Sequence, residues 1–156
     1  MTETYVLKQM VSLAHTPFQI VNRDGSVELG VGMRNVERLF YEKNHQMIAV
    51  ARERAREYPV IFAEKRLLFA VFPEDPVTGQ ILLAGPVVSR ALSREQLIEV
   101  RREWNMGKTD YQPPVTSIKK MVSMMLLLHW QSTGVTMSVD EFWKKKQEKL
   151  SVRAGV

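Results

Sequence analysis

Three apolar runs in the middle of the chain dominate its pattern of hydrophobic and polar positions. They cover Val60–Glu64, Leu67–Phe72 and Gln80–Ala84, and the segments between them carry charged residues, prolines and a glycine. Short runs rich in valine, isoleucine and phenylalanine and bounded by turn residues predict three successive antiparallel strands. None of the runs alternates apolar with polar residues, so we expect a sheet that is covered on both faces.

The first third of the chain predicts a helix followed by a hairpin. Residues Glu3–Ala14 carry apolar side chains at helical spacing. Phe18–Val21 and Val27–Val31 are strand-like, and Asp24-Gly25 between them suits a tight turn. We expect Phe18–Val21 to pair with Gln80–Ala84, which places the latter inside the sheet.

The remaining segments predict helices. Met33–Tyr58 has apolar stripes at helical spacing with a break or cap at Asn44, and Ser93 opens a second helical stretch. Ile118–Trp130 is apolar almost all round, which is typical of a buried helix. A capping-box sequence then introduces a last helix over Glu141–Leu150.

This element order predicts an α+β fold, a PAS/GAF-like five-stranded antiparallel sheet flanked by helices. In such folds a crossover helix covers one face of the sheet and the terminal helices cover the other. We assign residues 1–137 to this sensor-type domain and residues 138–156 to a C-terminal linker helix. Because such folds host many activities, the layout alone does not determine a function.

Composition narrows the possibilities further. The chain has 156 residues, a net charge of +5, 45% hydrophobic residues and no cysteine, which fits a single globular domain without disulfides or thiol chemistry. No apolar run is long enough for a membrane span and no signal-peptide pattern is present, so we expect a cytoplasmic protein without membrane contact. The basic residues are dispersed among acidic ones, which does not predict a nucleic-acid surface on this chain.

No motif predicts catalysis or metal binding. His15, His45 and His129 are far apart and have no metal-ligand spacing, and Glu74 and Asp75 fall in a proline-rich turn. Neither a nucleophile elbow nor a phosphate-binding glycine loop is present. We therefore expect no enzyme, no cofactor and no metal site.

Nine methionines and six phenylalanines could line an adaptable apolar cavity or could form an ordinary core. Small residues on the crossover stripe, Ala51 and Ala55, favour space between that helix and the sheet. The candidates for the lining of such a pocket are Phe40, Met47, Ile48, Phe62, Phe69 and Leu82.

The first helix suggests a homodimer. The crossover helix can cover only one face of the sheet, and the apolar stripe of the N-terminal helix is wider than one short helix usually needs. We expect a symmetric interface that uses the same patch from each subunit. The candidate interface residues are Val6, Leu7, Met10 and Val11.

Two stretches resemble a known type of regulator. An apolar strand that ends in Gly85-Pro86 precedes a short helix, a loop with Pro113-Pro114, and a helix from Lys120 to Trp130 closed by Thr133-Gly134. This arrangement is similar to the N-terminal sensor region of AraC-type, YSIRK-associated transcription regulators of Gram-positive bacteria. The resemblance implies a ligand-sensing and dimerisation domain that contacts DNA only through a helix-turn-helix region absent from this chain.

Three functions remain open at this point. The first is a domain that senses an unknown small-molecule effector in signal transduction, acting on a two-state equilibrium of its helices. The second is a protein-interaction or dimerisation module without a ligand. The third is an enzyme built on a PAS or GAF fold.

Overall fold

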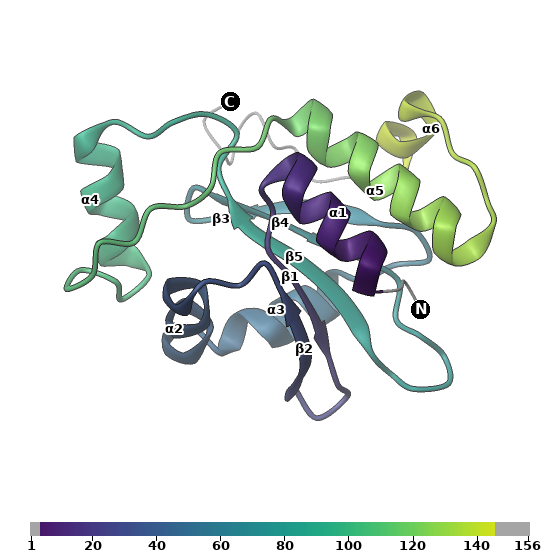
Figure 1. Ribbon diagram of the computed structural model, residues 1–156, viewed down its shortest axis with the longest axis horizontal. Coiled ribbons are helices and arrows are strands. Elements are labelled where there is room, and N and C mark those ends of the chain that lie inside the picture. The colour runs from purple at the N-terminus through teal and green to yellow at the C-terminus, as the bar shows by residue number, and fades with distance from the viewer. Residues whose placement is uncertain (1–3, 146–156) are drawn as a thin grey trace.

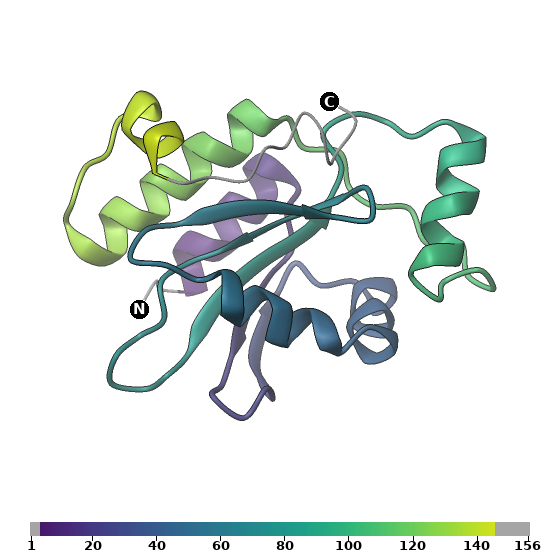
Figure 2. The ribbon, with the colours of Figure 1, turned by 180° about the vertical axis from the view of Figure 1, so that it is seen from behind.

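The structure of the protein is a computed structural model that describes residues 4–145. Five antiparallel strands form one sheet, and helices lie against both of its faces (Figures 1 and 2). The strands are β1 (Phe18–Val21), β2 (Val27–Val31), β3 (Val60–Glu64), β4 (Leu67–Val71) and β5 (Ile81–Val87). The helices are α1 (Thr4–Ala14), α2 (Asn35–Lys43), α3 (Gln46–Arg54), α4 (Arg94–Glu103), α5 (Ile118–Thr133) and α6 (Val139–Lys144).

The strand order is β2-β1-β5-β4-β3, and all of these pairs are antiparallel. Phe18 pairs with Ala84 and Val21 with Ile81, so β5 lies in the centre of the sheet between β1 and β4. The predicted meander and its pairing with β1 are confirmed. The layout is that of a PAS/GAF-like α+β domain, with the five-stranded antiparallel sheet flanked by helices.

The central strand runs further than its apolar pattern indicated. It continues through Gly85 to Val87. Gly85 has a φ of 109°, and a Cβ there would lie 2.7 Å from the carbonyl oxygen of Leu68 on the neighbouring strand. Only glycine suits both the conformation and the close approach of the two strands.

One face of the sheet is covered by α1, α5 and α6 (Figure 1). Their inward side chains form a continuous apolar core with alternate residues of the strands. Leu7 and Met10 of α1 and Phe142 of α6 belong to this core and are buried. Because Phe142 packs there, the first turns of the predicted linker helix are part of the domain, and the proposed boundary at residue 137 does not separate them. The part of that helix predicted beyond residue 145 lies outside the described residues.

The opposite face is packed against α2 and α3, and α4 lies to one side of the sheet, as the reverse view shows (Figure 2). Here the core is aromatic: the ring centroids of Phe40 and Trp104 are 5.0 Å apart, and those of Phe62 and Phe69 are 5.5 Å apart. The crossover is two helices rather than one, and it breaks at Asn44 as predicted. The Asn44 amide explains the break, because it donates to the carbonyls of Phe40 (2.9 Å) and Trp104 (2.7 Å) and ties the corner to α4.

Serine caps set the later helices. Ser93, Ser117 and Ser138 each accept a hydrogen bond from the backbone at the third helical position, which satisfies an amide that the helix leaves unpaired. Helix α5 is not buried all round as its sequence suggested, since Leu127 and Trp130 are about half exposed. Among the helices described, none has the combination of length and apolar character that crossing a bilayer requires.

Candidate functional site

The predicted cavity between the crossover helices and the centre of the sheet is filled by side chains. Phe40, Phe62 and Phe69 are fully buried; the ring of Phe69 contacts Phe40, Phe62 and Trp104, and Phe40 also contacts Trp104. Met47 and Ile48 are buried in the same cluster. Leu82 belongs to the other face, in the core beneath α1 and α5, because it is paired with Ile20 and points the same way. These residues therefore form a packed core, and Leu82 does not belong to a pocket under the crossover.

An open pocket of about 510 Å³ lies beside that core, between the α2–α3 corner and the β1–β2 hairpin. Helix α3 packs over β4, and the pocket lies to one side of it, over β1 and β2. Of the predicted lining residues, only Ile48 reaches it. Its described lining comprises Gln19, Val27, Glu28, Leu29, Gly30, Met33, Arg38, Tyr41, Glu42, His45 and Ile48.

Gln19 is the unusual residue of this pocket. It stands on β1 between Gly30 of β2 and Leu83 of β5, and only 1% of its surface is exposed. Within residues 4–145, neither its Oε1 nor its Nε2 makes a hydrogen bond of good geometry, although the amide lies near enough to the Tyr41 hydroxyl to lower the pKa of that phenol. Leaving both atoms of a buried amide unpaired is unfavourable, so this residue is the strongest sign of a binding site on the protein.

Gly30 on the neighbouring strand leaves room that the side chain of Met33 occupies. A Cβ at Gly30 would meet only the flexible side chain of Met33, 3.1 Å away. Any larger residue at position 30 would project from β2 on the same face as Gln19, since the two residues are paired. A side chain at position 30 would therefore displace Met33 and narrow the pocket beside Gln19.

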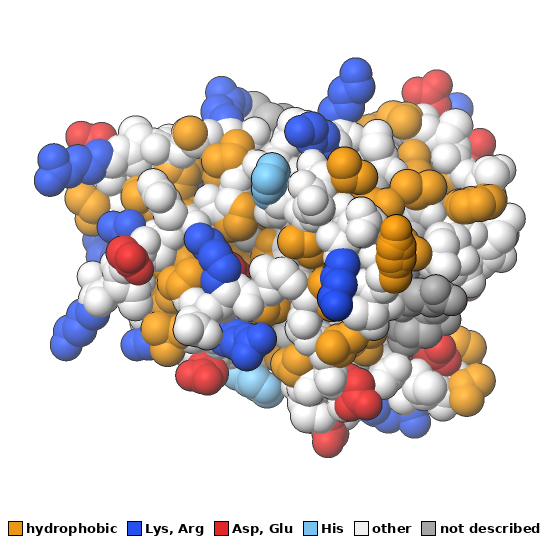
Figure 3. All heavy atoms as spheres, viewed as in Figure 1, with side chains coloured by type: hydrophobic (Ala, Val, Ile, Leu, Met, Phe, Trp, Pro, Cys, Tyr) orange, Lys and Arg blue, Asp and Glu red, His pale blue; other side chains and the backbone are white. Residues whose placement is uncertain are grey.

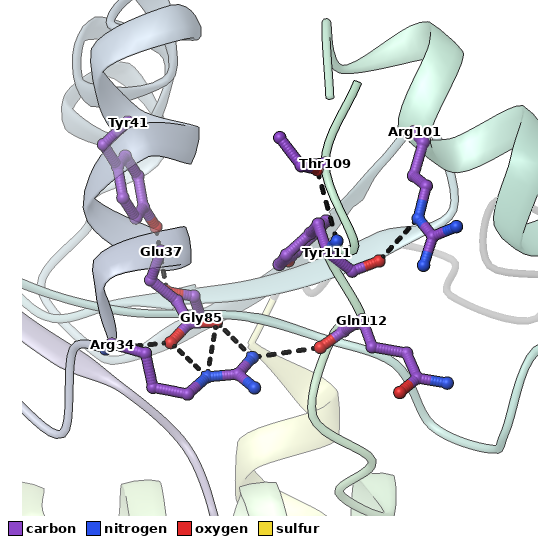
Figure 4. A network of polar contacts seen from close by, with 8 residues as sticks. All are labelled: Arg34, Glu37, Tyr41, Gly85, Arg101, Thr109, Tyr111 and Gln112. Carbon is purple, nitrogen blue, oxygen red and sulfur yellow. Dashed lines mark hydrogen bonds and ion pairs between the residues drawn. The ribbon is translucent and has the colours of Figure 1, made fainter. Parts of the chain in front are cut away.

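Tyr41 forms the wall next to Gln19, but its hydroxyl is already engaged. It donates to the carbonyl oxygen of Gly85 at 3.0 Å (Figure 4). Burial raises the pKa of the Tyr41 phenol well above its ordinary value, although the nearby Gln19 amide lowers it in part. The phenol stays neutral and its proton is engaged, so in the pocket it can act only as a hydrogen-bond acceptor.

Charged side chains surround the mouth of the pocket. Arg38 and Glu42 project from α2, and His45 stands at the corner before α3. All three are exposed, and no side-chain hydrogen bond or ion pair joins them to another residue in the described part of the chain. Glu28 accepts a hydrogen bond from Asn22 at 3.2 Å. The mouth of the pocket therefore carries both positive and negative side chains, whereas its interior is apolar except for the Gln19 amide and the Tyr41 hydroxyl.

The inner side of α2 carries a second set of polar contacts, drawn in Figure 4. Glu37 is 1% exposed and is held by Arg34 through an ion pair, and it also accepts from the Arg34 backbone amide at 3.0 Å. Arg34 in turn donates to the carbonyl of Gln112 at 3.0 Å. Arg101 of α4 donates to the Tyr111 carbonyl at 2.8 Å in the same loop. Helix α2 therefore borders the pocket on one side and is bonded to the loop before α5 on the other.

The candidate dimer residues lie elsewhere and are mostly inside the domain. Leu7 is fully buried and Met10 is 7% exposed, both against α5 and the sheet. Val6 and Val11 are partly buried against the same core. This helix stripe is used within the chain, so Leu7 and Met10 do not lie on the surface where the expected interface would form. The outer sides of α1 and α5 instead expose Tyr5, Leu13, Leu127 and Trp130.

The described residues hold no cluster of three or more histidine, cysteine, aspartate or glutamate side chains that could bind a metal ion. The three histidines are dispersed over α5, the α2–α3 corner and the turn after α1. Glu74 pairs with Arg52 at 3.0 Å, and Asp75 accepts from backbone amides of its own turn. These carboxylates serve local structure, as their place in a proline-rich turn suggests.

Comparison of the chain with protein-family models, with curated proteins and with solved structures finds no match. Sequence reasoning missed Gln19 because it lies in a short strand whose pattern is otherwise apolar. A signal was present: Gln19 is the single polar residue of Phe18–Val21, and the returning strand of the predicted hairpin holds Gly30.

Proposed function

We propose that this chain is a small-molecule-binding sensor domain and that its ligand binds in the pocket between α2 and the β1–β2 hairpin. The observation that carries this proposal is the buried, unpartnered amide of Gln19 at an open pocket. A volume of about 510 Å³ falls within the range of pockets that hold small molecules and cofactors. A core residue would have no reason to keep an unpaired amide there, whereas a ligand can satisfy it.

Helix α2 supports a sensing role rather than simple storage of a ligand. A bound molecule would contact Arg38, Tyr41 and Glu42 on α2, while Glu37 on the same helix is tied through Arg34 to the loop before α5. A shift of α2 on binding would reach that loop through these bonds. In this proposal the domain belongs to a cytoplasmic transcription regulator, and the DNA-binding part lies outside this chain.

The binding site can be tested by filling it. Gly30→Val should place methyl groups beside Gln19 in a strand that tolerates a β-branched residue. Gly107→Val is the matched control, since nothing lies within 4 Å of a Cβ at that position. Thermal shifts of the wild type and both variants would be recorded with a chemically diverse library of small metabolites.

The proposal expects compounds that raise the Tm of the wild type and of Gly107→Val but not of Gly30→Val. It fails if no compound stabilises the wild type, or if Gly30→Val responds to the same compounds as the control.

A second function, self-association, is favoured by the surface of the other face. Hydrophobic side chains lie exposed over α1, α5 and α6 (Figure 3). Trp130 is 49% exposed and Trp143 is 40% exposed, which is unusual for tryptophan outside an interface. We propose a homodimer through the outer sides of these helices, in place of the inward stripe predicted from the sequence.

Sedimentation at micromolar concentration tests this interface. Trp130→Glu should convert a dimer into a monomer without unfolding it, and Val77→Glu, at a position that is 86% exposed in the β4–β5 loop, is the control. A monomeric wild type would contradict the proposal.

A further inference from the structure

We propose that the pocket selects small, planar, uncharged molecules that carry a hydrogen-bond donor and an acceptor side by side, such as the lactam edge of a nucleobase or a carboxamide. This proposal rests on the proposed function, because it names the ligand class of the same pocket. Three observations support it: the hydrogen-bonding groups of the Gln19 amide, the hydrogen bond that already occupies the Tyr41 proton, and the charges at the mouth of the pocket.

The amide of Gln19 determines the shape of the recognised edge. A carboxamide presents an oxygen that accepts and an NH2 group that donates, in one plane and next to each other. Both atoms are buried and unpaired in the described structure. A ligand edge with the complementary order forms two parallel hydrogen bonds, as glutamine does with adenine. A wholly apolar ligand would leave both atoms unpaired and would be rejected on that account.

The side chains next to Gln19 in the pocket offer a ligand few further hydrogen bonds. The Tyr41 hydroxyl donates its proton to the Gly85 carbonyl, so towards a ligand its oxygen can only accept. Ile48 and Met33 are apolar and contribute walls without hydrogen bonds. The rest of a bound molecule therefore meets largely apolar surface, which suits an aromatic or heteroaromatic ring.

The charge of the lining disfavours anions. Glu28 and Glu42 contribute two negative charges, and Arg38 contributes one positive charge. A phosphate or dicarboxylate would meet two carboxylates against one guanidinium. We therefore expect a free base or a neutral amide to bind better than the corresponding nucleotide.

Calorimetric titration of the full chain with matched probes tests the ligand class. 2-Pyridone carries the donor–acceptor edge, whereas N-methyl-2-pyridone has the same ring without the donor. Adenine and adenosine monophosphate form a second pair that differs in charge. These comparisons need no variant, so they remain valid whatever a substitution does to folding.

Two substitutions of the amide sharpen the test. Gln19→Leu removes both hydrogen bonds and should weaken 2-pyridone on the order of 30-fold or more. Gln19→Glu replaces the donor by a second acceptor, so it should favour benzamidine, which presents two donors, over 2-pyridone. Gln131→Leu is the matched control, on α5 at the opposite face of the sheet.

The expected result is that 2-pyridone and adenine bind to the wild type and to Gln131→Leu, while their methylated or phosphorylated counterparts bind much less. Equal binding of N-methyl-2-pyridone, or no loss in Gln19→Leu, overturns the ligand class. If library compounds that Gly30→Val excludes still bind in that case, the sensing pocket stands and only its chemistry is wrong. If neither these probes nor the library bind, both proposals are overturned.

Discussion

The two faces of the sheet differ in how completely their helices fill the space above the strands. Under α1, α5 and α6, strand side chains such as Ile20 and Leu82 meet the apolar sides of the helices in a closed core. Under α2 and α3, an aromatic core occupies the centre, but the side next to β2 keeps an open pocket and the unpaired amide of Gln19. Packing under α1, α5 and α6 stabilises the fold, whereas the unpaired amide of Gln19 under α2 lowers its stability. Such a local departure from good packing is expected where a protein binds something.

The largest effect is expected on the closed face. Leu7→Ala should lower the free energy of unfolding by about 2–5 kcal/mol, because it removes a fully buried side chain and leaves a cavity. Val77→Ala in the β4–β5 loop is the control and should change it by less than about 0.5 kcal/mol, since Val77 is 86% exposed. Urea denaturation measures both. Dissociation of a dimer by Leu7→Ala without loss of stability would restore the interface predicted from the sequence.

A smaller loss is expected from the polar contacts behind α2. Glu37→Gln should lower the free energy of unfolding by about 2 kcal/mol, because it weakens a buried, charge-assisted set of bonds to Arg34. The matched control is Glu99→Gln. Glu99 forms an ion pair with Arg66 at 3.2 Å, and both side chains are exposed, so the free energy of unfolding should change by less than about 0.5 kcal/mol. Equal losses in the two variants would show that burial does not distinguish the two pairs.

The pocket should respond in the opposite direction. Gln19→Leu, measured without ligand, should raise the free energy of unfolding by about 1 kcal/mol, because it replaces a buried unpaired amide by an apolar side chain of similar size. Chemical denaturation at several urea concentrations measures the change. A loss of stability instead would mean that the amide is hydrogen-bonded in solution, and the contrast between the two faces would disappear.

The smallest expected effect is a dependence of stability on pH, which arises from His129 on the closed face. His129 of α5 is 6% exposed, its Nδ1 has no partner in the described region, and burial lowers the pKa of its imidazole below the ordinary 6.5. The unfolded chain then binds the proton more readily than the folded one. Stability should therefore be constant above about pH 6.5 and fall as the pH drops below it.

Thermal unfolding between pH 7.5 and 5.5 tests this expectation, and His129→Leu should flatten the profile. A wild-type Tm that rises on acidification would contradict the sign of the shift.

The position of the strands and the ends of the helices followed from local sequence. Apolar runs between turn residues located β3, β4 and β5, and the capping serines Ser93 and Ser138 located two helix starts. The break at Asn44 was also foreseeable, because its amide competes with the helical backbone for hydrogen bonds. These features depend on residues near one another in the chain, which is why the sequence alone determined them.

Only the tertiary structure decided which face of the sheet each strand side chain points to and where a pocket remains. In a strand that is apolar on both sides, no alternation tells which way Leu82 points; its pairing with Ile20 does. The stripe of Leu7 and Met10 shows that one side of α1 must be covered, but not whether this chain or another copy covers it. The pocket at Gln19 lies over β1 and β2, beside the place where α3 crosses β4. That crossing depends on contacts between segments far apart in the sequence.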